Sequence, residues 1–506
     1  MTSFAFNSSS TTAQTLVSGE SGFIGQNGAL YVNGADAITA SDSVSITVLG
    51  SLYAYGGAYQ AIDANSSYMQ LNIGEAGYIG SASSDAVSLI VSTSTSITNA
   101  GNIYGGDDGI QVSTSDGGAG FTLQNSGIIS ADDDAVSVNH GTGAATFINT
   151  GQILGDYWGI RSYGTGSSYV QNSGTITGLV HAINLDAGND SVVNTGTIFG
   201  DVELQEGADT LVNAGVLNGD VMLGSGADTF DGRGGTVVGT VFGGLEDDTY
   251  IVDDATTQIS ENADEGTDEV RSTVNFALGA NFENLTLLGA EHIDGKGNEL
   301  SNTIFGNSGN NDLRGLDGAD TIEGFAGDDA IYGGEGSDSL TGGFGADSLF
   351  GGDGGDVLAG GNGDDLLQGK DGDDTLKGWK GDDVLEGGGG NDSLIGSFGH
   401  DTLDGGSGKD TLAGGDGDDL LTGGLQADLF VFTDGFGNDT IADFAATWNA
   451  EKIDLSGVAA ITGFTDLSNN HMSQVGSDVV IDDGSGNTIT LESVSLGDLD
   501  AGDFLF

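Results

Sequence analysis

Residues 351–368 read GGDGGDVLA-GGNGDDLLQ, two units of nine residues with glycine at the first, second and fourth places, aspartate at the sixth and leucine at the eighth. Fourteen such units follow one another without insertion from Gly306 to Val431. The eighth place is apolar in every unit, and only Gln426 interrupts the glycines of the fourth place. One inward apolar side chain every nine residues builds a core only if successive units stack, so the period predicts a solenoid.

The sixth place of these units carries an oxygen-bearing side chain throughout. The glycine-rich half of a unit makes a turn and exposes backbone carbonyls, and the sixth residue adds a carboxylate to it. Rows of such oxygens suit Ca²⁺, which takes six to eight hard oxygen ligands. Without cations the stacked carboxylates repel one another, so folding and calcium binding should be one equilibrium. A disordered acidic tail, the usual meaning of a charge run, has no reason to keep this register. The candidate metal-binding residues are Asn311, Asp320, Asp329, Asp338, Asp347, Asp356, Asp365, Asp374, Asp383, Asp392, Asp401, Asp410, Asp419 and Asp428.

The stretch GGDGDDLLTGG (residues 414–424) and its neighbours resemble the repeats of RTX (repeats-in-toxin) calcium-binding proteins, over roughly residues 247–506. The resemblance implies a parallel β-roll with two units per coil and multiple Ca²⁺ between its turns. It also implies export by a type I secretion machinery through both membranes of a Gram-negative cell. The segment FGNDTIADF…EKIDLSGV resembles the cap of serralysin-type members, and the last residues, LGDLDAGDFLF, resemble their uncleaved export signal.

The amino-terminal region has a second repeat, Gly-x-Ile/Leu, which recurs nine times at spacings that contract from 28 to 19 residues. Six of its glycines follow an Asn by two places, and Asn-x-Gly suits a corner because both residues tolerate positive φ. Constant spacing on one side and variable spacing on the other predict the rungs of a parallel β-helix. The nine glycines are Gly22, Gly50, Gly77, Gly101, Gly127, Gly151, Gly174, Gly196 and Gly215.

The chain is therefore predicted to be all-β and to have four parts. A right-handed parallel β-helix spans residues 1–246, and a β-rich connecting segment without evident repeats spans 247–305. The calcium β-roll spans 306–431, and the cap with the secretion signal spans 432–506.

The amino-acid composition limits the classes of partner that the chain can bind. The formal net charge is −66, from 76 acidic and 10 basic residues, so nucleic acid and anionic membrane surfaces are excluded as partners and cations are required. The absence of cysteine excludes a disulfide framework. The sequence contains no run of about 18 apolar residues, so no membrane-inserting segment is predicted. The segment MTSFAFNSSSTTAQ lacks the features of a cleavable signal peptide, which agrees with export by a carboxy-terminal signal.

A catalytic site is not expected, because no H-E-x-x-H, G-x-S-x-G or P-loop motif occurs and the five histidines are scattered. Equal spacing places Asp108, Asp134, Trp158 and His181 in one column, with Arg161 close by. Carboxylates on adjacent rungs would be about 4.8 Å apart, close to a retaining glycosidase pair, and Trp158 could stack on a sugar. The simpler interpretation is an open, hydrated corner that gives no burial to raise a carboxyl pKa. Further acids beside the column, some of which could hold extra calcium, are Asp107, Asp132, Asp133 and Asp156.

The leading hypothesis is a secreted, non-enzymatic calcium-binding protein at or near the cell surface. It would assemble with itself into a surface layer, matrix or filament as calcium bridges acidic neighbours. Stacked edges at solenoid ends, which must be capped or paired, favour such assembly. The alternatives are a calcium-dependent adhesin that binds glycans or cell-surface polysaccharide, and a β-helical polysaccharide-modifying enzyme that uses Asp134 and its neighbours.

Overall fold

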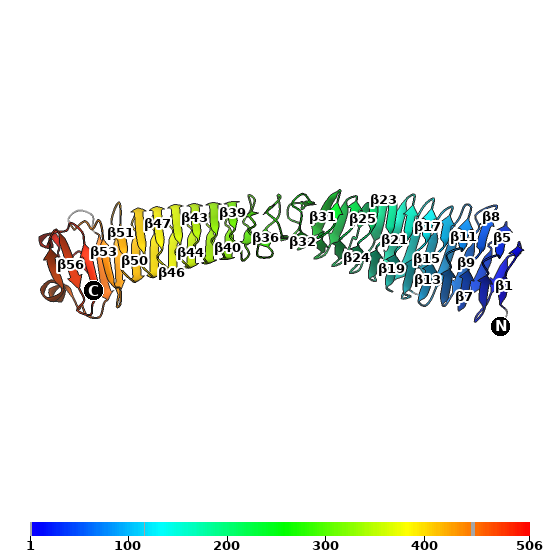
Figure 1. The fold of residues 1–506 in the computed structure, drawn as a ribbon, viewed down its shortest axis with the longest axis horizontal. Helices are drawn as coiled ribbons and strands as arrows, with labels where there is room; N and C mark the ends of the chain where they lie inside the picture. Colours follow the sequence, from blue (N-terminus) through cyan, green and yellow to red (C-terminus); the bar gives the residue numbers. More distant parts are fainter. Residues whose placement is uncertain (1–2, 116, 447–450) are drawn as a thin grey trace. The chain divides into compact units, whose positions relative to one another are not determined.

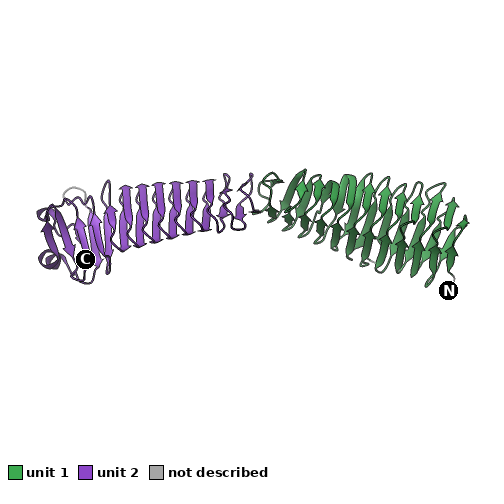
Figure 2. Ribbon diagram, in the orientation of Figure 1, with its two compact units in different colours: residues 1–268 green, residues 269–506 purple. Residues whose placement is uncertain are grey.

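The computed structural model describes residues 3–115, 117–446 and 451–506. Contacts within the chain define two compact units, residues 1–268 and 269–506 (Figure 2). Both units consist of stacked coils of short parallel strands (Figure 1), so the predicted all-β solenoid is confirmed. The division into four parts stays a prediction. No helix among the described residues is long and apolar enough to cross a membrane.

In the first unit, a coil has one strand in one parallel sheet and two strands in the other. Successive coils pair in register, as when Ile97 lies beside Leu123 and Leu123 beside Phe147. Alternate residues of each strand face inward and are buried, which builds one apolar core along the stack. The strands of four successive coils are β13 (Thr95–Asn99), β14 (Asn102–Gly105), β15 (Ile110–Thr114), β16 (Phe121–Asn125), β17 (Ile128–Ala131), β18 (Val136–Gly141), β19 (Ala145–Asn149), β20 (Gln152–Gly155), β21 (Trp158–Gly164), β22 (Ser168–Asn172) and β23 (Thr175–Leu185).

The corner of each coil is stabilised by a buried column of asparagines. Each Asn Nδ2 donates to the Oδ1 of the Asn in the next coil at 2.8 Å. The expected positive φ is wrong, because neither these asparagines nor the glycines two places later have it. Glycine is needed for close approach instead: a Cβ on Gly127 would lie within 3.0 Å of the Gly101 carbonyl. The column is Asn99, Asn125, Asn149, Asn172, Asn194 and Asn213.

The later coils of the first unit are shorter. Pairing continues from Val192 to Leu211 and from Leu211 to Phe230, so the core column is unbroken. The strands used below are β24 (Ser191–Asn194), β26 (Thr210–Asn213), β28 (Val221–Ser225), β29 (Thr229–Asp231), β31 (Thr240–Leu245), β32 (Thr249–Val252) and β33 (Gln258–Ser260).

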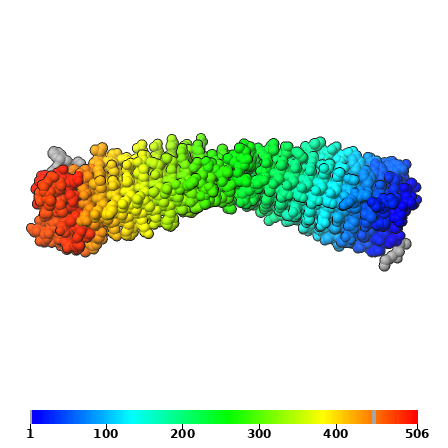
Figure 3. Space-filling model, viewed as in Figure 1, coloured from blue at the N-terminus to red at the C-terminus, as the bar shows by residue number. Residues whose placement is uncertain are grey.

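In the second unit, the repeats form strands that alternate between two parallel sheets. Each residue pairs with a partner 18 positions further on, as Leu340 does with Leu358. Two nine-residue repeats therefore make one coil, as the resemblance implied. The space-filling view in Figure 3 shows side chains closing the surface over the stacked coils of each unit. The strands are β39 (Asp312–Asp317), β40 (Thr321–Ala326), β41 (Ala330–Glu335), β42 (Ser339–Phe344), β43 (Ser348–Asp353), β44 (Val357–Asn362), β45 (Leu366–Asp371), β46 (Thr375–Lys380), β47 (Val384–Gly389), β48 (Ser393–Phe398), β49 (Thr402–Ser407) and β50 (Thr411–Asp416).

The second unit also contains strands before and after the repeats. Before them lie β34 (Glu269–Ser272), β35 (Phe276–Ala277), β36 (Asn284–Leu287), β37 (Gly295–Lys296) and β38 (Thr303–Phe305). After them lie β51 (Leu420–Thr422), β52 (Leu429–Thr433), β53 (Asn438–Ile441), β54 (Lys452–Gly457), α1 (Phe464–Asp466), the π-helix Leu467–His471, β55 (Met472–Val475), β56 (Asp478–Asp482), β57 (Thr488–Leu491), the 3₁₀-helix Leu496–Asp498 and β58 (Phe504–Leu505). Strands β55, β56 and β57 form an antiparallel meander, and β57 pairs in parallel with β53.

Candidate functional site

The sixth-place aspartates form two buried columns, because successive units alternate between the two sheets. In one column the backbone N–H of Asp320 donates to Oδ1 of Asp338 at 2.8 Å, and that of Asp338 donates to Asp356 in the same way. In the other column Asp347 donates to Asp365 at 2.8 Å. Each aspartate thus uses one oxygen to bind the preceding coil, although none of these side chains is more than 3% exposed.

The second oxygen of these carboxylates is buried and has no hydrogen-bond partner. It faces the first-place glycine of its own unit: a Cβ on Gly333 would lie within 3.0 Å of Asp338 Oδ2 and of the Gly351 carbonyl. Since φ at Gly333 is not positive, the missing side chain is needed for space and not for conformation. The Oδ2 atoms concerned belong to Asp320, Asp329, Asp338, Asp347, Asp356, Asp365, Asp374, Asp383, Asp392, Asp401, Asp410, Asp419 and Asp428.

These niches fit calcium. An orphaned carboxylate oxygen and a backbone carbonyl oxygen converge beside the glycine, where no side chain separates them, and both are hard donors. Burial raises the pKa of Asp365 to about 7, with Asp347 and Asp383 adding repulsion. A buried unpaired charge is costly, and a bound cation would remove that cost. The sixth-place carboxylates would hold the ions, and the ions would supply the charge that lets the columns stack. Ligation by each individual residue stays a prediction.

Asn311 stands at the start of one column and differs from the aspartates. Its Oδ1 accepts from the Asn307 N–H at 2.9 Å, and its Nδ2 donates to the Ile293 carbonyl at 2.6 Å. Both side-chain atoms are therefore engaged, and the residue brings no charge. At the other end, Asp439 extends the column: Asp419 N–H donates to its Oδ1 at 2.9 Å, and its Oδ2 is buried without a partner. Sequence reasoning missed Asp439, although GNDTI (residues 437–441) repeats the G-x-D-x-apolar half of the unit.

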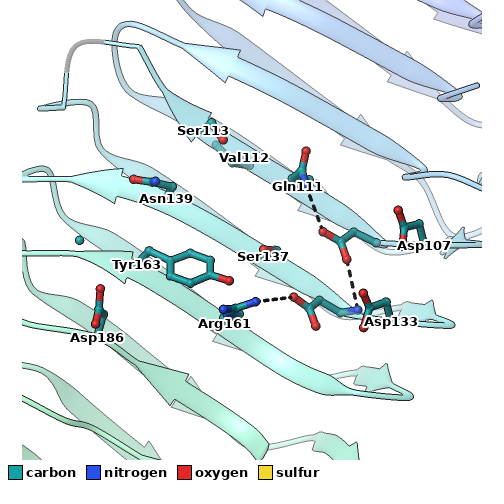
Figure 4. Close-up of a pocket in the computed structure, with 13 residues that line it drawn as sticks. Asp107, Gln111, Val112, Ser113, Asp133, Ser137, Asn139, Arg161, Tyr163 and Asp186 are labelled. Atoms are coloured by element: carbon teal, nitrogen blue, oxygen red, sulfur yellow. Dashed lines mark hydrogen bonds and ion pairs between the residues drawn. The ribbon is translucent and has the colours of Figure 1, made fainter.

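The first unit contains a groove of about 650 Å³ at the column predicted from rung spacing (Figure 4). The register brings Trp158 beside His181, and Asp134 N–H donates to Asp108 Oδ1 at 3.2 Å, so the predicted column is confirmed. Arg161 Nη1 lies 3.8 Å from Asp134 Oδ2, as the dashed line in Figure 4 shows.

The expectation of an open, hydrated corner is wrong for the two central carboxylates. Asp108 is 7% exposed and Asp134 is 4% exposed, because neighbouring coils cover both. Burial raises the pKa of Asp108 to about 7, with repulsion from Asp134 and Asp85 adding to it. Burial likewise raises the pKa of Asp134 to about 6, although Arg161 opposes the shift. The groove therefore contains a carboxyl pair whose pKa values suit proton transfer near neutral pH.

The aromatic residues at and near the groove differ from the prediction, because Tyr163 lines the groove and Trp158 does not. The Arg161 guanidinium lies 3.3 Å from the centroid of the Trp158 ring and 4.1 Å from that of Tyr163, so it stacks on both. Arg161 thus occupies a face of Trp158 that a sugar would use. Tyr157 is 45% exposed and is the freer platform.

The other predicted acids fall into smaller groups. Asp107, Asp108 and Asp133 have oxygens within 4.8 Å of one another, whereas Asp132 accepts from the Tyr104 hydroxyl at 3.0 Å. In the parts of the chain that the structure describes, neither group of acids close enough to hold a metal includes a histidine.

Comparison with known protein families identifies the same repeats. The family described as RTX calcium-binding nonapeptide repeat matches residues 297–329, 305–340, 323–358, 332–367, 359–394 and 395–430. No curated protein matches the chain. Among solved structures, the extracellular lipase LipA from Serratia marcescens is 20% identical with a TM-score of 0.20, and the match covers 47% of this chain and 45% of the lipase chain. The match thus spans less than half of the lipase.

Proposed function

We propose that this chain, which carries RTX repeats that bind calcium, is a secreted structural protein that folds on calcium binding outside the cell and then assembles with copies of itself. Export through a type I machinery before folding is part of the proposal. The repeat columns support calcium-dependent folding, because each sixth-place aspartate has a buried oxygen without a hydrogen-bond partner. Without calcium, no positive charge balances these carboxylates in the folded roll.

Self-assembly is supported by one column of exposed acids on the second unit. Asp317, Glu335, Asp353 and Asp371 stand directly beside one another in successive coils, on β39, β41, β43 and β45. All four are exposed, and none belongs to an ion pair among the described residues. Like charges about one strand spacing apart repel one another and attract divalent ions, which can bridge to acids of a second copy.

The test removes the exposed column while leaving the buried columns intact. The variant Asp317→Asn, Glu335→Gln, Asp353→Asn, Asp371→Asn should fold in calcium, by circular dichroism, but stay monomeric in sedimentation and electron microscopy. A control removes the same number of exposed charges at places where no acid pairs from the neighbouring coil, by Glu299→Gln, Asp416→Asn, Glu492→Gln and Asp498→Asn, and should assemble like the parent chain. Monomeric parent protein in millimolar calcium, or equal assembly of the column variant, would overturn self-assembly through this column.

A second candidate function is favoured by the groove of the first unit. Buried Asp108 and Asp134 line the groove, and the exposed Tyr157 packs against Trp158 outside the lining; together they would suit a neutral polysaccharide, as bound ligand or as substrate. Binding to neutral glycans that is weakened by Tyr157→Ala would support an adhesin. Release of reducing ends that is abolished by Asp134→Asn would support an enzyme. If the monomeric, calcium-loaded protein shows neither glycan binding nor release of reducing ends, this candidate is excluded.

A further inference from the structure

The first unit contains an aspartate column of its own, outside the residues that match the repeat family. Asp190, Asp209, Asp228 and Asp248 are each at most 3% exposed. Each accepts, through Oδ1, the backbone N–H of the residue in the preceding coil, at 2.6 to 2.8 Å. Each Oδ2 is buried without a hydrogen-bond partner. The arrangement matches that of the repeat columns.

The four coils differ at the residue five places before the aspartate. Three carry a fully buried leucine there, namely Leu185, Leu204 and Leu223. The fourth carries Gly243. Residues 243–251 read GGLEDDTYI, which matches the nine-residue repeat except that Glu246 replaces the glycine at the fourth place. Only the coil of Asp248 therefore has, at this position, the glycine that lets the aspartate Oδ2 approach the backbone closely, as in the repeats.

The niche beside Gly243 is lined by oxygen atoms. A Cβ on Gly243 would lie within 3.0 Å of Asp248 Oδ2, Glu261 Oε1 and the Tyr250 hydroxyl. Asp248, Glu261 and Asp268 each place a carboxylate oxygen so that all three lie within 4.8 Å of one another, and all three residues are buried. Asp268 Oδ1 accepts the Asp248 N–H at 2.8 Å, and Glu261 Oε2 accepts the Gly244 N–H at 3.3 Å, which fixes the two groups in place.

We propose that Asp248, Glu261 and Asp268 hold one divalent cation, best matched by Ca²⁺, in the niche beside Gly243. Three convergent carboxylates are hard oxygen donors in a buried place, which is the donor set that calcium prefers. The three carboxylates are buried and close together, so the charged cluster is costly until a cation balances it. The chain segment from β31 to Asp268 would then be ordered by this ion.

Two substitutions test the site without removing the column. Gly243→Ala places a methyl group in the niche, and φ at Gly243 is not positive, so the backbone tolerates alanine. Asp248→Asn keeps an Oδ1 that can accept the Asp228 N–H but removes the charge. The matched control is Asp228→Asn, one coil earlier, where the corresponding residue is Leu223.

The experiment is long-wavelength anomalous diffraction from crystals of the full chain in calcium chloride. A calcium peak between Asp248, Glu261 and Asp268 is expected in the parent chain and in Asp228→Asn, and no peak there in Gly243→Ala or Asp248→Asn. Peaks at the repeats with none at the niche of the parent chain would overturn the site and leave the repeat columns untouched.

Hydrogen exchange in solution gives an independent result for residues 240–265. With calcium at a hundredfold excess over Kd, exchange through opening of this segment should slow by about a hundredfold relative to chelator. Gly243→Ala and Asp248→Asn should lose that protection while the repeats keep theirs. Equal protection in parent and variants would contradict the proposal.

Discussion

The backbone N–H of Asp320 donates to Oδ1 of Asp338, one coil further along, at 2.8 Å. This bond commits one carboxylate oxygen to the stack and turns the other toward the niche beside the first-place glycine. Every coil of the roll is thus tied to its neighbour through a group that also needs a cation. We expect stacking and calcium binding to share the same side chain, which would couple the two.

Asp365→Asn should weaken the calcium dependence of folding. The substitution removes one niche carboxylate in the middle of a column, so the calcium concentration at the folding midpoint should rise by about tenfold, as expected for disturbing a metal site. Circular dichroism during calcium titration measures the midpoint. Asp364→Asn, at the exposed neighbouring place, is the control and should leave it within about twofold. Equal shifts in both variants would contradict ligation by Asp365.

Gly351→Ala should also weaken calcium binding, because the added methyl group crowds the Asp356 carboxylate. The added Cβ would lie within 3.0 Å of Asp356 Oδ2, whereas φ at Gly351 is not positive and imposes no backbone strain. Calcium affinity should therefore fall although every carboxylate is kept. Gly389→Ala is the control, because its nearest neighbour would be 3.5 Å away. Unchanged calcium affinity of Gly351→Ala, measured by calorimetry, would show that no ion uses this niche.

The calcium-free protein should gain β-structure as the pH falls. Burial raises the pKa of Asp365 and of Asp401 to about 7, above the value of about 3.9 in an unfolded chain. The folded roll therefore binds more protons than the unfolded chain, so its stability is lost as pH rises through about 7 and regained below it. In chelator, β-signal should be stronger at pH 5.5 than at pH 8. A chain that is equally unstructured at both values would contradict the expectation.

Asn149→Ala should destabilise the first unit and leave the second unchanged. Asn149 Nδ2 donates to Asn172 Oδ1 at 2.8 Å and to the Thr175 carbonyl at 3.0 Å, and its Oδ1 accepts from Asn125. Removing the amide leaves buried partners unsatisfied, at a cost of about 1–3 kcal/mol for each. Urea unfolding in saturating calcium, followed by hydrogen exchange of each unit, measures the loss. The exposed Asn102→Ala is the control, and an equal loss there would refute a special role of the column.

Much of the fold and of the aspartate columns could be predicted from the sequence alone. A period of nine with an apolar eighth place, as at Leu349 and Leu358, dictates that strands stack with their apolar residues inward, because no isolated unit can bury that side chain. The same period, with two repeats in each coil, places each sixth-place aspartate beside the one 18 residues further on. The equal rung spacing likewise brought Asp108 and Asp134 into one column.

Only the tertiary structure decided how those groups are buried and which of them converge. The corner asparagines form a buried ladder, and Asp108 and Asp134 are buried, which the spacing along the chain does not reveal. Asp248 meets Glu261 and Asp268 across two successive turns, and the niche depends on the absence of one side chain at Gly243. Periodicity along the chain determines which residues stack, whereas the space between stacked coils determines which oxygens are left without a partner.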